Sequence, residues 1–276
     1  MIQRSYEKSK YGNLYLVPTP IGNLDDITIR AKNILNECDI IYAEDSRETL
    51  KLLKLLNINK KVESCHKYSE MIHKDKIISI LKEGKNIAYV TDRGTPLISD
   101  PGNVIVDYAI ENNINVIALP GPNALLPAIN MSGISNQRFL FYGFLNKKKT
   151  YAKKELIDLK EIKHTLIFYE APHRIKDTLS LMLEVLGNRK IALVREISKL
   201  YEEIIRDNIE NVIKLCDNIK GEIVIIVQGS TNIDDNNNYE EMINELISSG
   251  YTKRDAIREI AERYNISKNK LYNEFK

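Results

Sequence analysis

Short apolar runs alternate with longer amphipathic stretches through the first half of the chain. Each run is rich in β-branched or aromatic residues, and each is followed by a helical pattern. The runs occupy residues 14–17, 39–43, 61–65, 87–91 and 115–119. Strands that alternate with helices are typical of a mostly parallel sheet covered by helices on both faces. We therefore predict a first α/β domain over residues 1–135.

The pattern changes near residue 135 and predicts a second α/β domain over residues 136–230. More of its apolar runs follow one another directly, so we expect a mixed sheet. These runs lie at 139–143, 164–169, 190–194, 202–206 and 222–227. Residues 231–276 combine a polar linker with three short helical patterns and predict a small helical C-terminal domain. The last two patterns resemble a helix-turn-helix, although such pairs also serve simply as packing units.

Three strands of the first half end in loops rich in glycine and proline. The loops read VPTPIGNL at 17–24, TDRGTPLISDPG at 91–102 and LPGPNAL at 119–125. In open α/β sheets, the loops beyond the carboxyl ends of the strands build the ligand crevice. We expect backbone N–H groups of these loops, together with the Asp92 carboxylate, to face such a crevice.

Polar side chains also follow other predicted strands. In the first half they are Glu44, Asp45, Arg47 and His66, and in the second half Glu170, His173, Arg174, Arg195 and Glu196. Any single carboxylate beside an arginine can be a structural ion pair. Their repeated position at strand ends favours one crevice shared by the two domains.

Composition excludes several classes of protein. The chain has no P-loop, GxGxxG, HExxH or GxSxG motif, which speaks against NTPases, common dehydrogenases, zinc hydrolases and serine esterases. Three scattered cysteines fit neither a disulfide framework nor a zinc site, and we expect no metal. We see no secretory signal and no apolar run approaching the roughly 20 residues that span a bilayer. We therefore expect a cytoplasmic protein that does not enter the membrane.

The formal net charge of +2 requires any affinity for nucleic acid to come from local patches. One candidate patch lies in residues 146–154, which contain Lys147, Lys148, Lys149, Lys153 and Lys154. Such a run is either a solvated surface or a contact to backbone phosphates. The sequence leaves both interpretations open.

Five further motifs accompany the three loops: AEDSR at 43–47, YGFL at 142–145, FYEAPHR at 168–174, VREISK at 194–199 and KGEIVIIVQG at 220–229. Taken together in their order along residues 14–230, these eight motifs resemble those of the ribosomal RNA small subunit methyltransferase I family, which belongs to the tetrapyrrole methylase superfamily. The resemblance implies two α/β domains with the cofactor in the inter-domain cleft, a small C-terminal domain and a homodimer. It also implies transfer of a methyl group from S-adenosylmethionine to the 2′-hydroxyl of a cytidine in 16S rRNA of the small ribosomal subunit.

The resemblance also implies a set of cofactor-binding residues. They are Pro20, Asp92, Gly94, Thr95, Asn123, Ala124, Tyr169, Glu170 and Ile197. The sequence departs from the family pattern at Ser69, Arg93 and Asn146. Arg93 matters most, because it introduces a long cation into the central loop, where it either pairs with a carboxylate or faces RNA.

A ribose hydroxyl is a weak nucleophile, so the reaction requires in-line positioning and a proton acceptor. Our candidates for the acceptor are Glu44, Asp45 and Glu170. The candidates for contacting the phosphates next to the target nucleotide are Arg47, His173, Arg174 and Arg195. The candidates for contacting the surrounding RNA are Lys147–Lys149 and the C-terminal helices. Because the target must be exposed, we expect an assembled or nearly assembled subunit as the substrate.

Two other functions remain open at this point. The superfamily fold also permits methylation of a tetrapyrrole or another small acceptor, because fold does not determine substrate. Alternatively, the protein is an RNA-binding module that binds the cofactor without catalysis. The carboxylates at the strand ends favour an enzyme.

Overall fold

The computed structural model describes residues 2–5, 7, 9–66, 69–231, 239–264 and 267–275. The chain divides into two compact units, Met1–Gly229 and Ser230–Lys276. Residues 232–238, in the polar linker predicted at the start of residues 231–276, lie outside the described residues. Across the described ranges, no helix is both long and apolar enough to cross a membrane.

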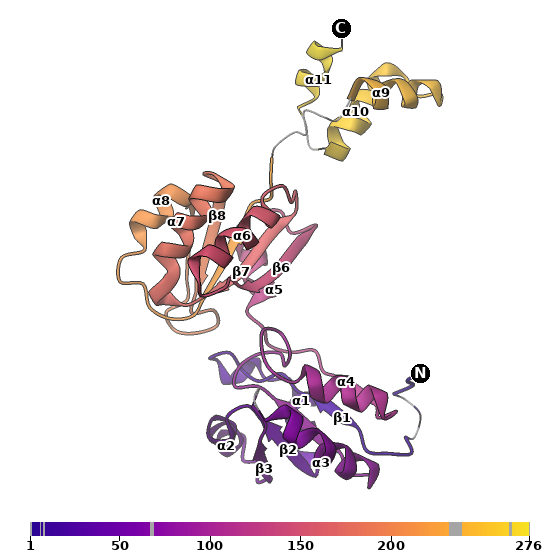
Figure 1. Ribbon diagram of the computed structural model, residues 1–276, viewed down its shortest axis with the longest axis vertical. Helices are drawn as coiled ribbons and strands as arrows, with labels where there is room; N and C mark the ends of the chain where they lie inside the picture. Colours follow the sequence, from indigo (N-terminus) through magenta and orange to yellow (C-terminus); the bar gives the residue numbers. More distant parts are fainter. Residues whose placement is uncertain are drawn as a thin grey trace. The chain divides into compact units, whose positions relative to one another are not determined.

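The first sheet of the larger unit is entirely parallel. Its strands run in the order β3-β2-β4-β1-β5, so β4 and β1 occupy central positions. They are β1 (Leu14–Leu16), β2 (Ile40–Ala43), β3 (Val62–Ser64), β4 (Ile87–Val90) and β5 (Val116–Ala118). The central strand β4 is buried along its whole length, as its continuous apolar run requires. The predicted parallel α/β arrangement is confirmed (Figure 1).

Helices cover both faces of this sheet. On one face α1 (Ile29–Glu37) and α2 (Ser46–Leu55) insert the buried side chains of Leu35 and Leu53. On the other face α3 (Glu70–Lys82) and α4 (Asn103–Glu111) lie side by side (Figure 1) and contribute Ile77 and Ile105 to a second core. The sheet is therefore buried on both sides, and its ligand-accessible region is restricted to the strand ends.

The second sheet is mixed, as predicted, with strand order β6-β7-β10-β8-β9. Only the β6–β7 pair among the described strands of this sheet is parallel. The strands are β6 (Phe139–Phe144), β7 (Thr165–Glu170), β8 (Lys190–Arg195), β9 (Glu203–Asn208) and β10 (Ile223–Val227).

Both faces of the second sheet are covered. Helices α6 (Lys149–Leu159), α7 (Ile175–Leu186) and α8 (Ile209–Leu215) share one core with it. Helix α5 (Leu125–Ser132) packs on the opposite face through Ala128 and Ile129. Helix α5 thus lies before residue 135 but packs on the second sheet, while the domain boundary at that residue stays a prediction.

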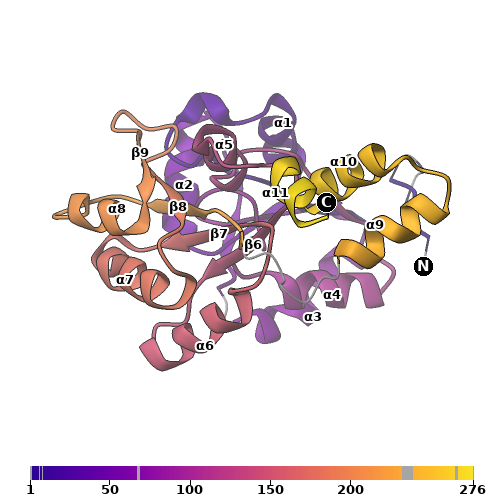
Figure 2. The same cartoon turned by 90° about the horizontal axis from the view of Figure 1, so that it is seen from above.

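The smaller unit consists of α9 (Tyr239–Ser248), α10 (Lys253–Tyr264) and α11 (Lys268–Glu274). Helix α10 contacts both of the others (Figure 2). The three share a small core that includes Tyr239, Ile257 and Leu271, which accounts for the apolar positions of each helical pattern.

Side-chain caps mark the starts of two helices on the first sheet. Residues Leu24–Asp26 form a 3₁₀ turn before α1, and Thr28 caps α1 by accepting the Ala31 amide hydrogen. Asp45 caps α2 by accepting the Arg47 amide hydrogen. In both cases the residue nearest the first helical turn provides the side-chain oxygen.

The start of α4 is capped by a residue from another helix. Gly102 precedes α4 with a φ of 124° and has no side chain to offer. The buried carboxylate of Glu70, in the first turn of α3, instead accepts the amide hydrogens of Gly102 at 3.1 Å and Val104 at 3.2 Å. Glu70 therefore anchors the end of the loop that connects β4 to α4.

We predict that Glu70→Ala lowers the free energy of unfolding by about 2 kcal/mol, because two amide groups at the helix N-terminus lose their acceptor. Urea denaturation measures this change. Glu111→Ala, an exposed residue at the other end of α4, is the matched control and should change stability by less than about 0.5 kcal/mol. Equal stabilities of the two variants would contradict the capping role of Glu70.

Candidate functional site

The three glycine- and proline-rich loops are joined to one another by hydrogen bonds. Thr19 and Gly94 exchange two backbone hydrogen bonds, of 2.9 and 3.0 Å, which link the first loop to the central one. The Thr95 hydroxyl donates to the Pro122 carbonyl oxygen at 3.0 Å and links the central loop to the third. The loops therefore form one continuous surface beyond the carboxyl ends of β1, β4 and β5.

Two glycines make this close packing possible. Gly94 has a φ of 80°, a conformation that side chains other than glycine rarely adopt. At Gly121, a Cβ atom would lie only 2.7 Å from the Cβ atom of Pro18, so the third loop approaches the first too closely for any side chain.

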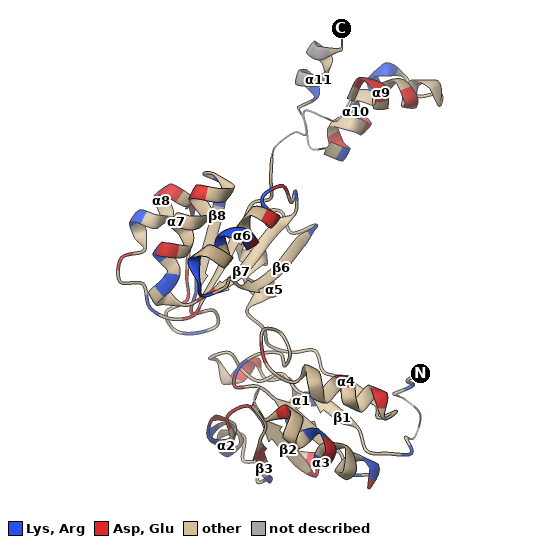
Figure 3. Ribbon diagram, viewed as in Figure 1, with Lys and Arg blue, Asp and Glu red and all other residues tan. Residues whose placement is uncertain are grey.

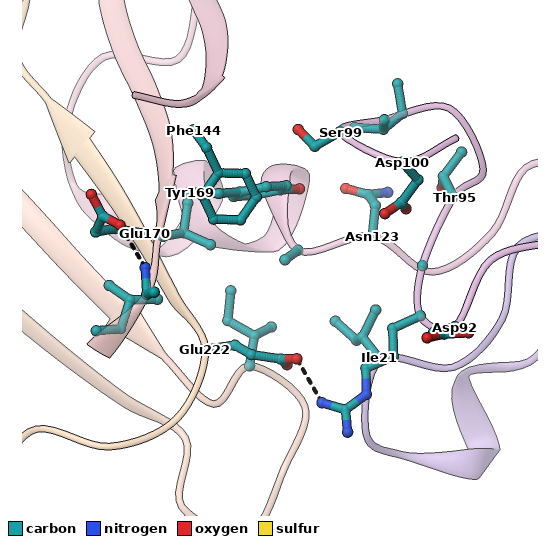
Figure 4. A pocket seen from close by; sticks show the side chains of 18 of the residues that line it. Ile21, Asp92, Thr95, Ser99, Asp100, Asn123, Phe144, Tyr169, Glu170 and Glu222 are labelled. Atoms are coloured by element: carbon teal, nitrogen blue, oxygen red, sulfur yellow. Dashed lines mark hydrogen bonds and ion pairs between the residues drawn. The ribbon is translucent and has the colours of Figure 1, made fainter. Parts of the chain in front are cut away.

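These loops and the ends of several strands of the second sheet surround a pocket of about 620 Å³. All of the cofactor-binding residues predicted from the sequence line it except Pro20. Those residues are Asp92, Gly94, Thr95, Asn123, Ala124, Tyr169, Glu170 and Ile197. Figure 4 shows Asp92, Thr95 and Asn123 on one side of the pocket and Tyr169 facing them.

Several lining residues were not predicted as site residues. They include Ile21, Ile98, Ser99, Asp100, Phe144 and Glu222. Ser99 and Asp100 belong to the central loop, and Phe144 belongs to the YGFL motif. The sequence analysis therefore singled out the segments that contain these three residues, but not the residues themselves. Their orientation into the pocket depends on backbone conformation that sequence periodicity does not describe.

Two isoleucines that line the pocket lie in backbone segments of similar conformation. Leu97 and Ser99, with φ values of 70° and 68°, flank Ile98. Glu196 and Ser198, with φ values of 52° and 68°, flank Ile197 in the same way. Positive φ is unusual for residues other than glycine and clusters at ligand sites, where surrounding packing maintains it.

The residues predicted to contact RNA lie outside the pocket lining. Arg47 is paired with Asp45, while its own side chain remains 83% exposed. Lys147–Lys149 and His173 are exposed. Arg174 donates to the carbonyl oxygens of Leu145 and Asn146, and Arg195 pairs with Glu203, so these two arginines are held by protein contacts.

Six carboxylates line the pocket: Glu44, Glu48, Asp92, Asp100, Glu170 and Glu222. Glu48 pairs with Lys51, and Glu222 pairs with Arg93 and Lys199. The Arg93 cation thus has a carboxylate partner, at 2.6 Å. Asp92 accepts the backbone amide hydrogen of Asp45 at 3.0 Å and thereby positions the tip of β2.

Glu170 is engaged by its own surroundings. Its carboxylate is 3% exposed and accepts hydrogen bonds from Thr178 at 2.6 Å and from the Ala171 amide at 2.7 Å. The Arg174 guanidinium lies 3.5 Å away. Figure 4 shows the Glu170 side chain well apart from Asp100 and Asn123.

Asp45 is also engaged, and it does not line the pocket. Its carboxylate accepts hydrogen bonds from Arg47 Nε at 3.0 Å and Nη2 at 2.6 Å. These bonds lower the pKa of Asp45 to about 2. A carboxylate with so low a proton affinity is a weak proton acceptor near neutral pH.

Among the lining carboxylates, three form no ion pair with lysine or arginine in the described part of the chain: Glu44, Asp92 and Asp100. Asp92 accepts the Asp45 amide hydrogen, as described above. Burial and the nearby charge of Glu44 raise the pKa of Asp100 to about 7. Burial and the charges of Asp92 and Asp45 raise the pKa of Glu44. A proton acceptor whose pKa lies near the working pH is well matched to general-base catalysis.

No group of three or more His, Cys, Asp or Glu side chains in the described ranges is arranged to hold a metal ion.

The arrangement of two sheets is shared with methyltransferases of known structure. Uroporphyrin-III C-methyltransferase from Thermus thermophilus, solved with S-adenyl homocysteine, superposes with a TM-score of 0.57 at 20% sequence identity. The alignment covers 79% of this chain and 97% of that one. The methyltransferase CobJ superposes with a TM-score of 0.60 at 16% identity, over 80% of this chain and 95% of that chain. The profile of the Tetrapyrrole (Corrin/Porphyrin) Methylases matches residues 13–213, which defines the class.

Curated relatives narrow this class. Ribosomal RNA small subunit methyltransferase I of Bacillus subtilis is 46% identical, over 97% of this chain and 95% of the relative. The protein of the same name from Haemophilus influenzae is 41% identical over 95% of each chain. The chain belongs to the ribosomal RNA small subunit methyltransferase I family of the tetrapyrrole methylases.

We predict that Asp100→Asn stabilises the protein more at pH 8 than at pH 5. The raised pKa means that the folded protein disfavours the ionised carboxylate, so Asp100 lowers stability increasingly between its ordinary pKa of about 3.9 and about 7. Allowing for partial exposure, the gain from the substitution should be larger at pH 8 by about 1 kcal/mol.

Denaturant unfolding at the two pH values measures this difference. Asp107→Asn, an exposed position on α4, is the control and should show no such dependence on pH. A stabilisation by Asp100→Asn that is the same at pH 5 and pH 8 would argue against a raised pKa at Asp100.

Proposed function

We propose that this protein transfers a methyl group from S-adenosylmethionine to the 2′-hydroxyl of a cytidine in 16S rRNA of the small ribosomal subunit. The observation that carries this proposal is the 46% identity, over nearly the whole chain, to a protein named for methylation of small-subunit ribosomal RNA. The homodimer and the cytoplasmic location implied by the family resemblance belong to the same proposal.

The pocket is suited to S-adenosylmethionine. Its volume of about 620 Å³ lies within the usual range for small-molecule sites, about 300–1,000 Å³. Apolar side chains such as Ile21, Ile98 and Ile197 line it together with carboxylates, a combination suited to a ligand with an aromatic base, hydroxyl groups and positive charge. When bound, the cofactor supplies an activated methyl group.

We assign cofactor binding to the predicted residues that line the pocket. The backbone of Gly94, Asn123 and Ala124 offers close approach, Asp92 and Thr95 offer polar atoms, and Tyr169 and Ile197 provide the facing wall. Glu170 maintains the end of β7 through its buried hydrogen bonds. Pro20 acts by shaping the first loop next to Ile21.

Proton removal from the acceptor hydroxyl is assigned to lining carboxylates that form no ion pair with lysine or arginine in the described ranges. Asp92, which also forms none, is assigned to cofactor binding above. Of the three residues predicted from the sequence, Glu44 has the position and the raised pKa that the role requires, whereas Asp45 and Glu170 are engaged elsewhere. Asp100 joins Glu44 as a fourth candidate. We infer that Asp100 accepts the proton and that the charge of Glu44 raises its proton affinity.

RNA binding is assigned to exposed cations. Lys147–Lys149 form no ion pair with the described acidic residues and stand exposed at the start of α6, while Arg47 and His173 are also exposed. Phosphate neutralisation by such groups contributes affinity without reading sequence. Arg174 and Arg195, which are held by protein contacts, would act by positioning their strands and loops.

The direct test uses tritiated S-adenosylmethionine and small subunits from a strain that lacks this gene. We expect label to be recovered as 2′-O-methylcytidine after nuclease digestion. Subunits from the parent strain, already methylated, should accept little label. If the protein binds the cofactor in a separate titration but leaves the mutant subunits unlabelled, the acceptor is not small-subunit RNA and small-molecule acceptors should be tested.

We predict that Asp100→Asn lowers kcat by about 10²-fold or more, the usual contribution of a general base. Glu44→Gln should lower kcat by a smaller factor, because it removes only the charge that raises the proton affinity of Asp100. Asp45→Asn should lower kcat by less than about tenfold, because its carboxylate is already committed to Arg47. Single-turnover methylation of small subunits measures these changes, with cofactor affinity determined separately.

The pH dependence provides an additional check. The wild-type rate should rise with pH and level off above about 7, and Asp100→Asn should lose that dependence. An Asp45→Asn enzyme as impaired as Asp100→Asn would overturn the assignment.

A further inference from the structure

An exposed aromatic side chain stands at the edge of the pocket. Phe144, the last residue of β6, lines the pocket and is 53% exposed. Its ring contacts Tyr169 edge to face, with the ring centroids 5.7 Å apart. Figure 4 shows both rings at the pocket, facing the loop that carries Ser99 and Asp100. About half of this side chain is therefore left uncovered by the protein and is accessible to a ligand at the pocket.

A β-bulge determines where the Phe144 ring points. The pairing of β6 with β7 is regular up to Phe141 and shifts by one residue between Phe141 and Gly143. In an uninterrupted strand Phe144 would share the face of Tyr142, which packs against the core beneath α6 and α7. The extra residue instead places Phe144 on the face of Phe141 and the pocket.

Gly143 makes this bulge possible. Its φ is 82°, which favours glycine, and a Cβ atom there would lie 3.0 Å from the Ser99 hydroxyl oxygen. The central loop thus packs directly against the bulge. On the other side, Arg174 donates to the carbonyl oxygens of Leu145 and Asn146, both at 3.2 Å. The backbone is held on both sides of Phe144, so its ring is presented in a defined position.

The chain immediately beyond Phe144 is basic and contains a second exposed aromatic ring. Lys147–Lys149 follow at the start of α6 (Figure 3), and Tyr151 is 51% exposed, with Lys148 Nζ 5.9 Å from its ring centroid. Lysines beside exposed aromatic rings suit a ligand that combines phosphates with planar bases. S-adenosylmethionine has no phosphate, so this surface matches RNA better than it matches the cofactor.

We propose that Phe144 is the platform on which the base of the acceptor nucleotide stacks, with Lys147–Lys149 on the neighbouring phosphates. This inference rests on the proposed function and adds the residue that positions the target base. RNA-binding proteins commonly hold splayed-out bases on exposed aromatic faces in this way. Stacking on a ring fixed by the bulge would bring the attached ribose to the pocket, next to the loop that carries Asp100.

The test compares Phe144→Ala, Phe144→Leu and Phe144→Trp. Loss of base stacking should raise the KM for small subunits about 5- to 100-fold in the Ala and Leu variants, whereas Trp should stay within about threefold of the wild type. The dissociation constant for S-adenosylmethionine, measured by calorimetry, should change less than about twofold in all three. Phe139→Ala, an exposed phenylalanine at the other end of the same strand, is the matched control and should leave both constants unchanged.

Each result has a distinct meaning. If Phe144→Ala weakens cofactor binding as much as subunit binding, the ring stacks on adenine and the proposal is wrong. Unchanged constants in the Ala and Leu variants would likewise overturn it, as would a Trp variant that folds but behaves like Leu. The proposed function is judged separately by whether the wild-type enzyme labels small subunits at all, so its failure cannot be mistaken for failure of the stacking role.

Discussion

The backbone pairing of Thr19 with Gly94 is the constraint on which the rest of the site depends. Parallel strands bring their carboxyl ends to one edge of a sheet, but the loops beyond them are free to diverge. Here two backbone hydrogen bonds join the first loop to the central loop, and Thr95 joins the central loop to the third. These hydrogen bonds therefore hold the residues of three separate loops on one surface.

The second sheet completes the pocket through strand ends and loops. Ile197 and Tyr169 face the loops of the first sheet, and the Arg93–Glu222 ion pair connects the central loop to the start of β10. Both partners of this pair are more than half exposed, so it contributes little stability by itself. Packing of α5 against the second sheet, with Ile129 buried, contributes more to stability than this ion pair, because it removes apolar surface from water.

The carboxylates of the site differ in their proton affinity because some have ion-pair or buried hydrogen-bond partners and others do not. Those bound by lysine, arginine or buried hydrogen-bond donors serve to position loops and strand ends. Glu44 and Asp100 are left close to one another with no lysine or arginine partner among the described residues, and burial makes the charged form of each less favourable. The difference between positioning and chemistry is therefore a difference in environment between side chains of the same type.

The sequence was sufficient to predict the strands and helices, because hydrophobic periodicity is a local property that reports directly which face of a strand or helix is buried. It predicted the parallel and the mixed sheet, the loops that bear Asp92 and Asn123, and the family. Tertiary structure alone decided which carboxylates are available. Asp45 and Glu170 have the same neighbours in sequence whether or not they are bound by Arg47 or Thr178, and Asp100 has a raised pKa only because folding buries it near Glu44. The direction of Phe144 was likewise set by a bulge that exists only in the pairing of β6 with β7. Some of these contacts join near neighbours, as between Asp45 and Arg47, and others join distant parts of the chain, as between Glu44 and Asp100. In both cases the folded geometry decides which contact forms, and a one-dimensional pattern does not contain that geometry.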